Sequence, residues 1–373
     1  MQRLTRSGSA GSAPELTGGD GCDMLIERIK EADQMKILVA LTGGTIGSAE
    51  NEGVISVCLE KCRVVELYRR QFPQDDTEFV TESPYSVLSE NLCAGHWEKL
   101  LGFMLAYNLN GFDGVIVAHG SDTLSYTSAM LGLCLHGLEV PVVVTASDYV
   151  PDDPRSNALT NFKAAVDLIA QTRSGVFTIY RNPAEQYAQV FIPTQLKEAD
   201  RINDCFYSTN DLSFAAVRPD GQLREYAHPL SVAALEQRER FSLPAYPHFE
   251  KSVRLIHPYP SMDYTAILSD DTVGAVLHVT YHSGTISGQA VSLLERCRDK
   301  QIPFYLCSLK SSARAVYETG NMLLNAGALP LYDIGTESAY AKLLLAVNFF
   351  PENIDGFMKK DIYFEQTISC FKK

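Results

Sequence analysis

Residues 36–48, KILVALTGGTIGS, decide the fold. The apolar run at 37–41 has no polar alternation, which predicts a strand buried on both faces of a parallel sheet. Gly43 and Gly44 follow it, and glycine permits backbone conformations and close approaches that other residues do not. Thr45 then presents a hydroxyl near the carboxyl end of the strand, where open α/β sheets bind ligands. Taken alone, this turn is more typical of a plain connection between a strand and a helix.

A second stretch, DGVIVAHGSDTLSYTSAM at 113–130, repeats the design. Its apolar run at 115–118 again predicts a buried strand, and Gly120, Ser121 and Asp122 lie in the turn that follows. Two buried parallel strands can place their terminal turns side by side in one crevice. The pair of turns therefore indicates a site that neither turn indicates alone.

Composition places the chain among water-soluble globular proteins. Its formal net charge of -13 argues against a nucleic-acid surface. We find neither an apolar span long enough to cross a membrane nor an apolar signal segment at the N-terminus. We therefore expect a cytosolic protein that binds neither nucleic acid nor a membrane.

Cysteine and histidine give no sign of a metal site or a disulfide framework. The nine cysteines are an odd number and are dispersed, which is typical of reduced thiols. Cys58 and Cys62 could face one side of a helix, but no nearby cysteine or histidine pair completes a zinc site, and the eight histidines are equally scattered. We expect no metal and no cofactor.

The order of the predicted elements indicates an α/β fold with a larger N-terminal parallel-sheet domain and a smaller C-terminal α/β domain. Residues 1–34 are expected to be a disordered or leader segment followed by a short helix. Strands alternate with helices over 35–225, proline and charge accumulate in a linker at 226–251, and a second alternating series fills 252–373.

The polar segment 47–60, GSAENEGVISVCLE, follows Thr45 and has the composition of a loop. A mobile loop beside a nucleophile is a candidate lid. A plain surface connection is an equally good interpretation.

Three segments together resemble the bacterial-type L-asparaginase family: TGGTIG at 42–47, HGSDTL at 119–124 and DDPRSNALTNFKAA at 152–165. The resemblance is nearest to the cytosolic type I enzymes and continues in register through LIHPYP at 255–260 and TESAYAKL at 336–343. It implies hydrolysis of L-asparagine to L-aspartate and ammonia through an acyl-enzyme, with glutamine as a second substrate of some members. It also implies a homo-oligomer, a dimer or a tetramer.

The resemblance assigns catalytic roles to four residues. Thr45 matches the threonine nucleophile, and Ser121, Asp122 and Lys197 match the set that supports catalysis. An alcohol is a weak nucleophile at neutral pH and needs a base. A desolvated Lys197 beside Asp122 would supply a proton relay through Ser121. Most lysines in proteins are instead solvated residues on the surface.

The resemblance also assigns the substrate-binding residues. Ser89 and Glu90 match those that hold the substrate's α-carboxylate and α-amino group, and Asp122 also matches an amino ligand. Backbone N–H groups of the glycine turns, at Gly44 and Gly120, are suited to hold a developing oxyanion.

His119, Ser121 and Asp122 are also the residue types of a serine-hydrolase triad. Adjacent residues at the end of a strand point in different directions, and a triad is defined by geometry. We therefore interpret His119 as a packed, hydrogen-bonded residue.

The sequence departs from the family at several positions. Ser121 stands where the family has a threonine, and Val54 stands where we expect a tyrosine that helps to activate the nucleophile. Asn157 and Ala158 replace an Asp-Gly pair, and Thr285 stands where an asparagine from a neighbouring protomer usually reaches the substrate.

These departures leave three interpretations open. The first is an L-asparaginase-like amidohydrolase, in which Tyr85 or Tyr126 substitutes for the missing phenol. The second is hydrolysis of another small amide, such as glutamine or a derivatised asparagine. The third is a catalytically weak homologue that binds amino acids or regulates. A nucleotide-binding protein is disfavoured because TGGTIG lacks the GxGxxG spacing.

Overall fold

The computed structural model describes residues 34–51, 54–57, 62–226, 228–268, 270–313 and 315–367, with only the backbone described at 48–51 and 54–57. The leader segment and short helix expected at 1–34 lie outside these residues, apart from residue 34. Contacts join residues 35–373 into one compact unit. The division of that unit at 226–251 stays a prediction.

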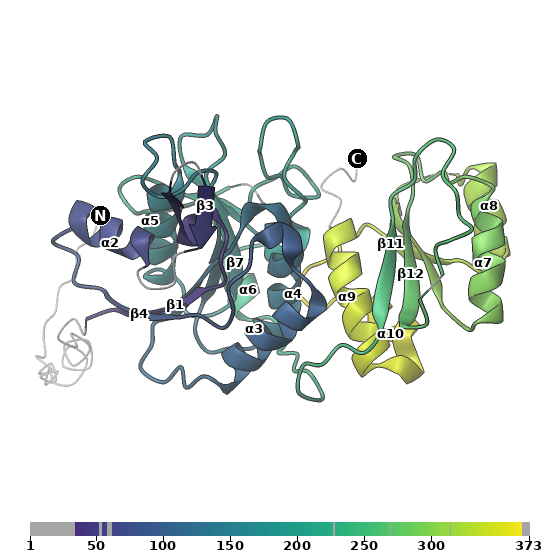
Figure 1. Cartoon of the computed structure of the whole chain (residues 1–373), viewed down its shortest axis with the longest axis horizontal. Coiled ribbons are helices and arrows are strands. Elements are labelled where there is room, and N and C mark those ends of the chain that lie inside the picture. Colours follow the sequence, from purple (N-terminus) through teal and green to yellow (C-terminus); the bar gives the residue numbers. More distant parts are fainter. Residues whose placement is uncertain are drawn as a thin grey trace, which may run out of the picture. The chain divides into compact units, whose positions relative to one another are not determined.

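An eight-stranded sheet forms the first half of this unit (Figure 1). Its strands are, in spatial order, β10 (Leu223–Glu225), β9 (Ala215–Val217), β8 (Ala188–Phe191), β7 (Val176–Tyr180), β6 (Val142–Thr145), β5 (Gly114–Ala118), β1 (Lys36–Leu41) and β4 (Glu78–Glu82). The five strands from β4 to β7 run parallel. Every residue of β5, β6 and β7 is buried, which confirms the predicted α/β class and explains the unbroken apolar runs.

The remaining three strands of this sheet are antiparallel to their neighbours. Sequence patterning does not predict them, because strands of three or four residues are too short to show a clear period. They extend the sheet beyond β7.

Four helices accompany the parallel strands: α2 (Arg63–Gln71), α3 (Ala94–Ala106), α4 (Leu124–Leu135) and α5 (Ala158–Ile169). Helices α4 and α5 both contact β6 and β7, and Figure 1 shows them on opposite sides of these strands. Helix α2 packs on α5, and α3 packs on α4. All residues of α4 except Tyr126 are buried, because α9 (Thr336–Phe349) covers the face that the sheet does not.

The segment expected to be a loop at 47–60 contains a hairpin instead. Strands β2 (Ser48–Asn51) and β3 (Val54–Val57) pair antiparallel directly after the first glycine turn. The loop prediction was therefore wrong over this range. It gave more weight to the polar composition than to the β-branched residues of β3, which favour a strand.

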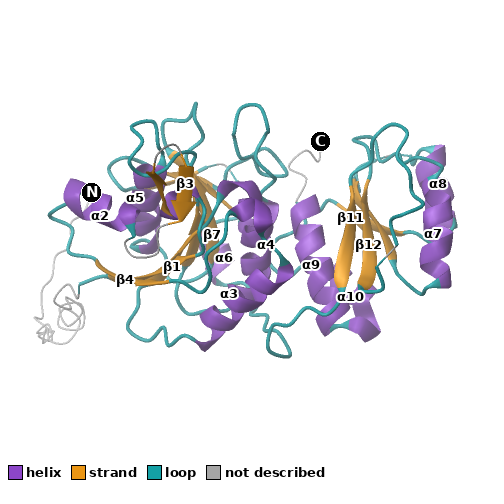
Figure 2. Ribbon diagram, viewed as in Figure 1, coloured by secondary structure: helices purple, strands orange, loops and turns teal. Residues whose placement is uncertain are grey.

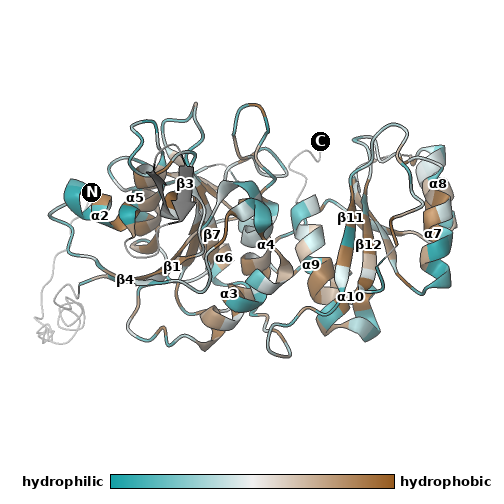
Figure 3. Cartoon of the chain, viewed as in Figure 1, coloured by the Kyte–Doolittle hydropathy of each residue, from teal (hydrophilic) through white to brown (hydrophobic). Residues whose placement is uncertain are grey.

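A second, all-parallel sheet forms the other half of the unit (Figure 2). Its strands are β11 (Ser252–Ile256), β12 (Val273–Val279), β13 (Phe304–Leu309) and β14 (Leu329–Tyr332). Helices α7 (Ala290–Asp299) and α8 (Glu318–Asn325) contact each other, and α9 contacts β11, β12 and β13. In Figure 3 these strands and helices carry brown, hydrophobic stretches next to teal and white ones. The chain also forms α6 (Val232–Glu236), η5 (Pro351–Asn353) and α10 (Ile354–Lys359).

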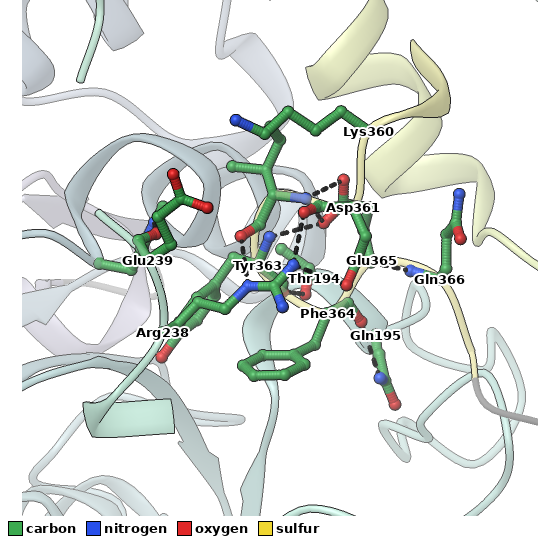
Figure 4. A network of polar contacts seen from close by, with 12 residues as sticks. Thr194, Gln195, Arg238, Glu239, Lys360, Asp361, Tyr363, Phe364, Glu365 and Gln366 are labelled. Atoms are coloured by element: carbon green, nitrogen blue, oxygen red, sulfur yellow. Dashed lines mark hydrogen bonds and ion pairs between the residues drawn. The ribbon is translucent and has the colours of Figure 1, made fainter. Parts of the chain in front are cut away.

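The C-terminal segment, residues 360–367, ties α10 to the large sheet (Figure 4). The Tyr363 hydroxyl accepts the Val176 N–H at 2.9 Å. Thr194 donates its hydroxyl to the Tyr363 carbonyl, and the Gln195 amide donates to the Phe364 carbonyl at 2.8 Å. These contacts fix the chain just before Lys197.

A buried ion pair holds the same segment. The Lys342 ammonium lies 2.5 Å from the Glu365 carboxylate, and both side chains have no exposed surface. Burial raises the pKa of Glu365, but Lys342 and backbone N–H donors lower it more, so its pKa lies below the ordinary value. Lys342 also donates to the Met358 carbonyl at 3.1 Å. The pair is therefore well satisfied, as a buried charge must be.

Candidate active site

The two glycine turns lie side by side because β1 and β5 are neighbours in register. Leu41 at the end of β1 pairs with Ala118 at the end of β5. Both the N–H and the hydroxyl of Thr42 donate to the Ala118 carbonyl, at 3.1 and 2.9 Å. The structure thus brings together the two turns that the sequence marks for chemistry.

Glycine is required where the turns touch. Gly43 and Gly44 have φ angles of 104° and 73°, which side chains disfavour. A Cβ on Gly44 would lie 2.3 Å from the Gly120 Cα, and a Cβ on Gly120 would lie 2.4 Å from the Ser89 hydroxyl. The backbones of the two turns and the Ser89 side chain therefore share one closely packed point.

Thr45 begins η1 (Thr45–Gly47), directly after this contact, and is half-buried. The short helix reverses the chain into β2, with the Gly47 N–H bonded to the Gly44 carbonyl at 3.2 Å. The predicted nucleophile is thus carried on a turn that the neighbouring strand fixes.

Ser89 and Asp122 meet across the crevice. Ser89 lies in η2 (Ser89–Asn91), is 5% exposed, and donates its hydroxyl to the Asp122 carboxylate at 3.0 Å. Asp122 lies in η3 (Ser121–Thr123), whose Thr123 hydroxyl donates back to the Ser89 carbonyl at 3.0 Å. Glu90 is exposed beside them. Two of the predicted substrate-binding residues are therefore joined directly.

His119 is a packed residue rather than a base. It is 2% exposed, its Nδ1 donates to the Gly120 carbonyl at 2.8 Å, and its Nε2 accepts from Thr127 at 3.0 Å. Trp97 donates in turn to the Thr127 hydroxyl at 2.9 Å. Burial lowers the pKa of His119 to about 4. The imidazole is therefore neutral, and its hydrogen bond helps to position the second glycine turn.

Lys197 has a different partner from the one expected. Its ammonium pairs with the Asp211 carboxylate at 2.9 Å, and its side chain is 40% exposed. It borders a cavity of about 520 Å³ that Glu337 also lines, whereas Ser121 and Asp122 line another cavity. The relay predicted for Lys197 would need its ammonium to leave Asp211.

The two candidate phenols differ in position. Burial raises the pKa of Tyr85, whose hydroxyl lies near Thr42 in the first glycine turn. Burial also raises the pKa of Tyr126, whose hydroxyl lies near Glu198. The Val54 side chain lies outside the described residues. Tyr85 is therefore the phenol nearer to the first turn.

Ser121 and Asp122 open into a cavity of about 450 Å³. Its wall also includes Asp148 and Arg155 from the loop after β6, and Arg181 directly after β7. We did not predict these three residues as part of a site. Their signal in the sequence is their place after predicted buried strands, where ligands bind in such sheets.

Asn157 and Asn161 bridge these two loops. The Asn157 side chain accepts the Asp148 N–H and donates to the Arg181 carbonyl, at 3.1 and 2.9 Å. The Asn161 side chain donates to the Ala146 carbonyl and accepts the Arg181 N–H, at 2.9 and 2.8 Å. Asn157, a departure from the family, is therefore a structural brace here.

The arrangement combines the Thr45 hydroxyl on a glycine turn, the Asp122 carboxylate held by the Ser89 hydroxyl, and a cavity that Asp122 lines. Amide hydrolysis needs a nucleophile and donors for an oxyanion, and a hydroxyl and backbone N–H groups are groups of these chemical types. No cluster of metal-binding side chains occurs among the described residues. No described helix is long and apolar enough to span a membrane.

Comparison with known proteins supports this interpretation of the turns. Residues 36–191, which carry both glycine turns and Ser89, match the family model for the N-terminal asparaginase domain. Residues 36–191 belong to the asparaginase family. The resemblance seen in the sequence is thereby confirmed.

Proteins that are not named as asparaginases are also similar to this chain in sequence. The chain is 28% identical over 348 residues to a glutamyl-tRNA(Gln) amidotransferase subunit from Aeropyrum pernix, covering 89% of this chain and 79% of the relative. It is 25% identical over 341 residues to the protein of the same name from Thermococcus kodakarensis, covering 86% and 76%. The chain is therefore similar to asparaginase-family proteins that take part in amide transfer.

Solved structures share the fold. The thermostable L-asparaginase from Thermococcus kodakarensis superposes with a TM-score of 0.73 at 22% identity, covering 90% of this chain and all of that one. L-asparaginase I from Vibrio cholerae gives a TM-score of 0.71 at 21% identity, with the same coverage. At these identities the likeness establishes the fold alone.

Proposed function

We propose that this protein hydrolyses the side-chain amide of L-asparagine to L-aspartate and ammonia, with Thr45 as the nucleophile of an acyl-enzyme. The observation that carries the proposal is the contact between the two glycine turns, where Gly44 packs against Gly120 and Ser89 bonds to Asp122. This contact gathers four of the residues that the family resemblance assigns to the site.

Each residue has a physical role in the proposal. Ser89, Glu90 and Asp122 hold the substrate's carboxylate and ammonium, because a carboxylate oxygen accepts and an ammonium donates. Ser121 passes the Thr45 proton towards Lys197 after Lys197 leaves Asp211. Backbone N–H groups at the glycine turns stabilise the oxyanion, and loss of one such donor typically lowers the rate about 100- to 1,000-fold.

Glutamine is the second candidate substrate. The relatives named as glutamyl-tRNA(Gln) amidotransferase components favour an enzyme that handles a glutamine amide. The cavity beside Ser121 is large enough for the additional methylene.

A weakly active amino-acid-binding homologue is the alternative from another class. The ion pair of Lys197 with Asp211 favours it, because Asp211 then holds the ammonium that the relay through Ser121 needs. A cytosolic location and assembly into a homo-oligomer, a dimer or a tetramer, belong to this proposal as family properties.

The test is ammonia release from L-asparagine, L-glutamine and D-asparagine by the wild-type protein and by Thr45→Ala. We expect the wild type to release ammonia from an L-amide and the variant to release almost none. Thermal stabilisation by L-aspartate without any ammonia release would favour the binding homologue. Release that persists unchanged in Thr45→Ala would contradict the assigned nucleophile.

A further inference from the structure

Arg181 occupies a fixed position at the edge of the candidate active site. It directly follows β7, and its N–H and carbonyl are both bonded to side chains, those of Asn161 and Asn157. The residue lines the cavity that contains Ser121 and Asp122, and it also borders a second cavity on the α5 side. Its side chain thus stands in the wall between the two.

One nitrogen of the Arg181 guanidinium has no partner in the described part of the chain. The guanidinium forms no ion pair with any described residue, and its Nε is buried without a hydrogen-bond partner. Arg155, the other cation of the same cavity, is instead bonded to Asp153, with its Nε 3.0 Å and its Nη2 2.6 Å from the carboxylate. A buried unpaired donor costs free energy, so a ligand that binds it recovers that cost.

Two of the three acidic groups of the cavity, Asp122 and Asp148, already have other partners. Asp122 accepts the Ser89 hydroxyl, and Asp148 accepts the N–H groups of Tyr149 and Asn157 at 2.8 and 2.9 Å. Asp204 is exposed at the rim. Arg181 is therefore available to an anion from outside, whereas Asp122 is suited to an ammonium group.

The cavity has room for a ligand larger than free asparagine. About 450 Å³ lies within the range of pockets that hold drug-sized molecules. The proposed roles of Ser89 and Glu90 account for the amino-acid end of a substrate. Arg181 and the rest of the cavity are then available to a substituent on the amide nitrogen of the substrate.

We propose that the site accepts an N-substituted amide whose leaving amine carries a carboxylate, and that Arg181 binds this carboxylate. The inference rests on the proposed function and specifies its substrate class. The Thr45 hydroxyl attacks the amide carbonyl, and the C–N bond breaks as the carboxylate-bearing amine leaves with the Thr45 proton. Water then hydrolyses the Thr45 ester, which releases L-aspartate and restores the hydroxyl. Arg181 is suited to the role because its planar fork pairs with both carboxylate oxygens.

A matched pair of ligands isolates the carboxylate: β-L-aspartyl-glycine and β-L-aspartyl-glycinamide. We would measure both affinities by calorimetry with the full-length Thr45→Ala protein, in which hydrolysis is blocked. We expect the glycine ligand to bind about 10- to 100-fold more tightly, as for a hydrogen bond to a charged group. Adding Arg181→Gln should remove this preference, and Arg181→Lys should keep part of it. Arg155→Gln, the control in the same cavity, should leave it unchanged.

The outcomes separate this inference from the proposed function. Equal affinities for the two ligands, a lack of binding by both, or a preference that survives Arg181→Gln would each overturn the role of Arg181. Failure of the wild type to hydrolyse any amide would contradict the proposed reaction instead, since the binding measurement does not depend on turnover.

Discussion

The Ser89 hydroxyl donates a 3.0 Å hydrogen bond to the Asp122 carboxylate and so joins η2 to η3. The two residues are 33 positions apart in the sequence. In the proposed function, this carboxylate and this hydroxyl bind the charged groups of an amino acid. The bond thus links the packing of the two turns to the recognition of a substrate.

Replacing Ser89 tests this link. Ser89→Ala removes the donor to Asp122, and we expect the KM for the amide substrate to rise about tenfold, as for loss of a hydrogen bond to a charged group. Steady-state kinetics measures the KM of the variant. Ser86→Ala, an exposed serine in the same loop, is the control and should keep the wild-type KM. An unchanged KM in Ser89→Ala would show that Ser89 has no role in substrate binding.

The close contact of the two turns predicts a stability effect. Gly44→Ala adds a Cβ that would lie 2.3 Å from the Gly120 Cα at a φ of 73°, so we expect the free energy of unfolding to fall by about 2 kcal/mol or more. Gly47→Ala in the same turn has no atom of the described residues within 4 Å of the new Cβ and should change it by less than about 0.5 kcal/mol. Denaturant unfolding compares the two. Similar losses in both variants would contradict the contact.

The fold is largely predictable from sequence where buried apolar runs mark its strands. The runs at 37–41 and 115–118 predict β1 and β5, and the adjacency of these strands places both glycine turns at one edge. Strands β8, β9 and β10 are too short for such a pattern, and the hairpin at β2 and β3 is obscured by its polar residues.

The site is only partly predictable for a different reason. Glycine and hydroxyl residues mark the two turns in the sequence. Gly44, Gly120 and Ser89 are therefore predicted from the sequence together with the family resemblance. The partner of a long charged side chain depends on which groups the folded chain places near it. The sequence predicts neither the pairing of Lys197 with Asp211 nor the lack of a partner for the Arg181 Nε among the described residues.

The buried His119 predicts how stability depends on pH. Its pKa falls from an ordinary 6.5 to about 4 in the folded chain, so below 6.5 the unfolded chain takes up a proton that the folded chain refuses. Stability is therefore lost as the pH falls from about 6.5 towards 4. We expect His119 to account for a loss of about 2 kcal/mol between pH 7.5 and pH 5.

Unfolding of the wild type and of His119→Gln at both pH values measures that contribution. The variant should lose less stability on acidification, whereas the exposed His282→Gln should behave as the wild type does. The same pH dependence in all three proteins would show that His119 is protonated in the folded state.

The ion pair of Lys342 with Glu365 predicts another large effect. Glu365→Gln leaves the buried ammonium without its counter-charge, and breaking such a pair typically costs about 3–5 kcal/mol. Thermal unfolding should show this loss, while the exposed Glu352→Gln should be near neutral. Replacing both partners with Lys342→Met and Glu365→Leu should recover part of the stability. No recovery would mean that the fold needs the charges themselves.

The central claim is that the turns after β1 and β5 form one hydrolytic site, and a double-mutant cycle on ammonia release tests it most directly. We would measure kcat/KM on the preferred L-amide for the wild type, Thr45→Ala, Asp122→Asn and the double variant. Residues that act as one unit are strongly non-additive. We expect each single variant to lose most of the activity. The double variant should have about the same kcat/KM as the less active of the two single variants. Losses that multiply, or an Asp122→Asn protein with wild-type activity, would contradict a shared site.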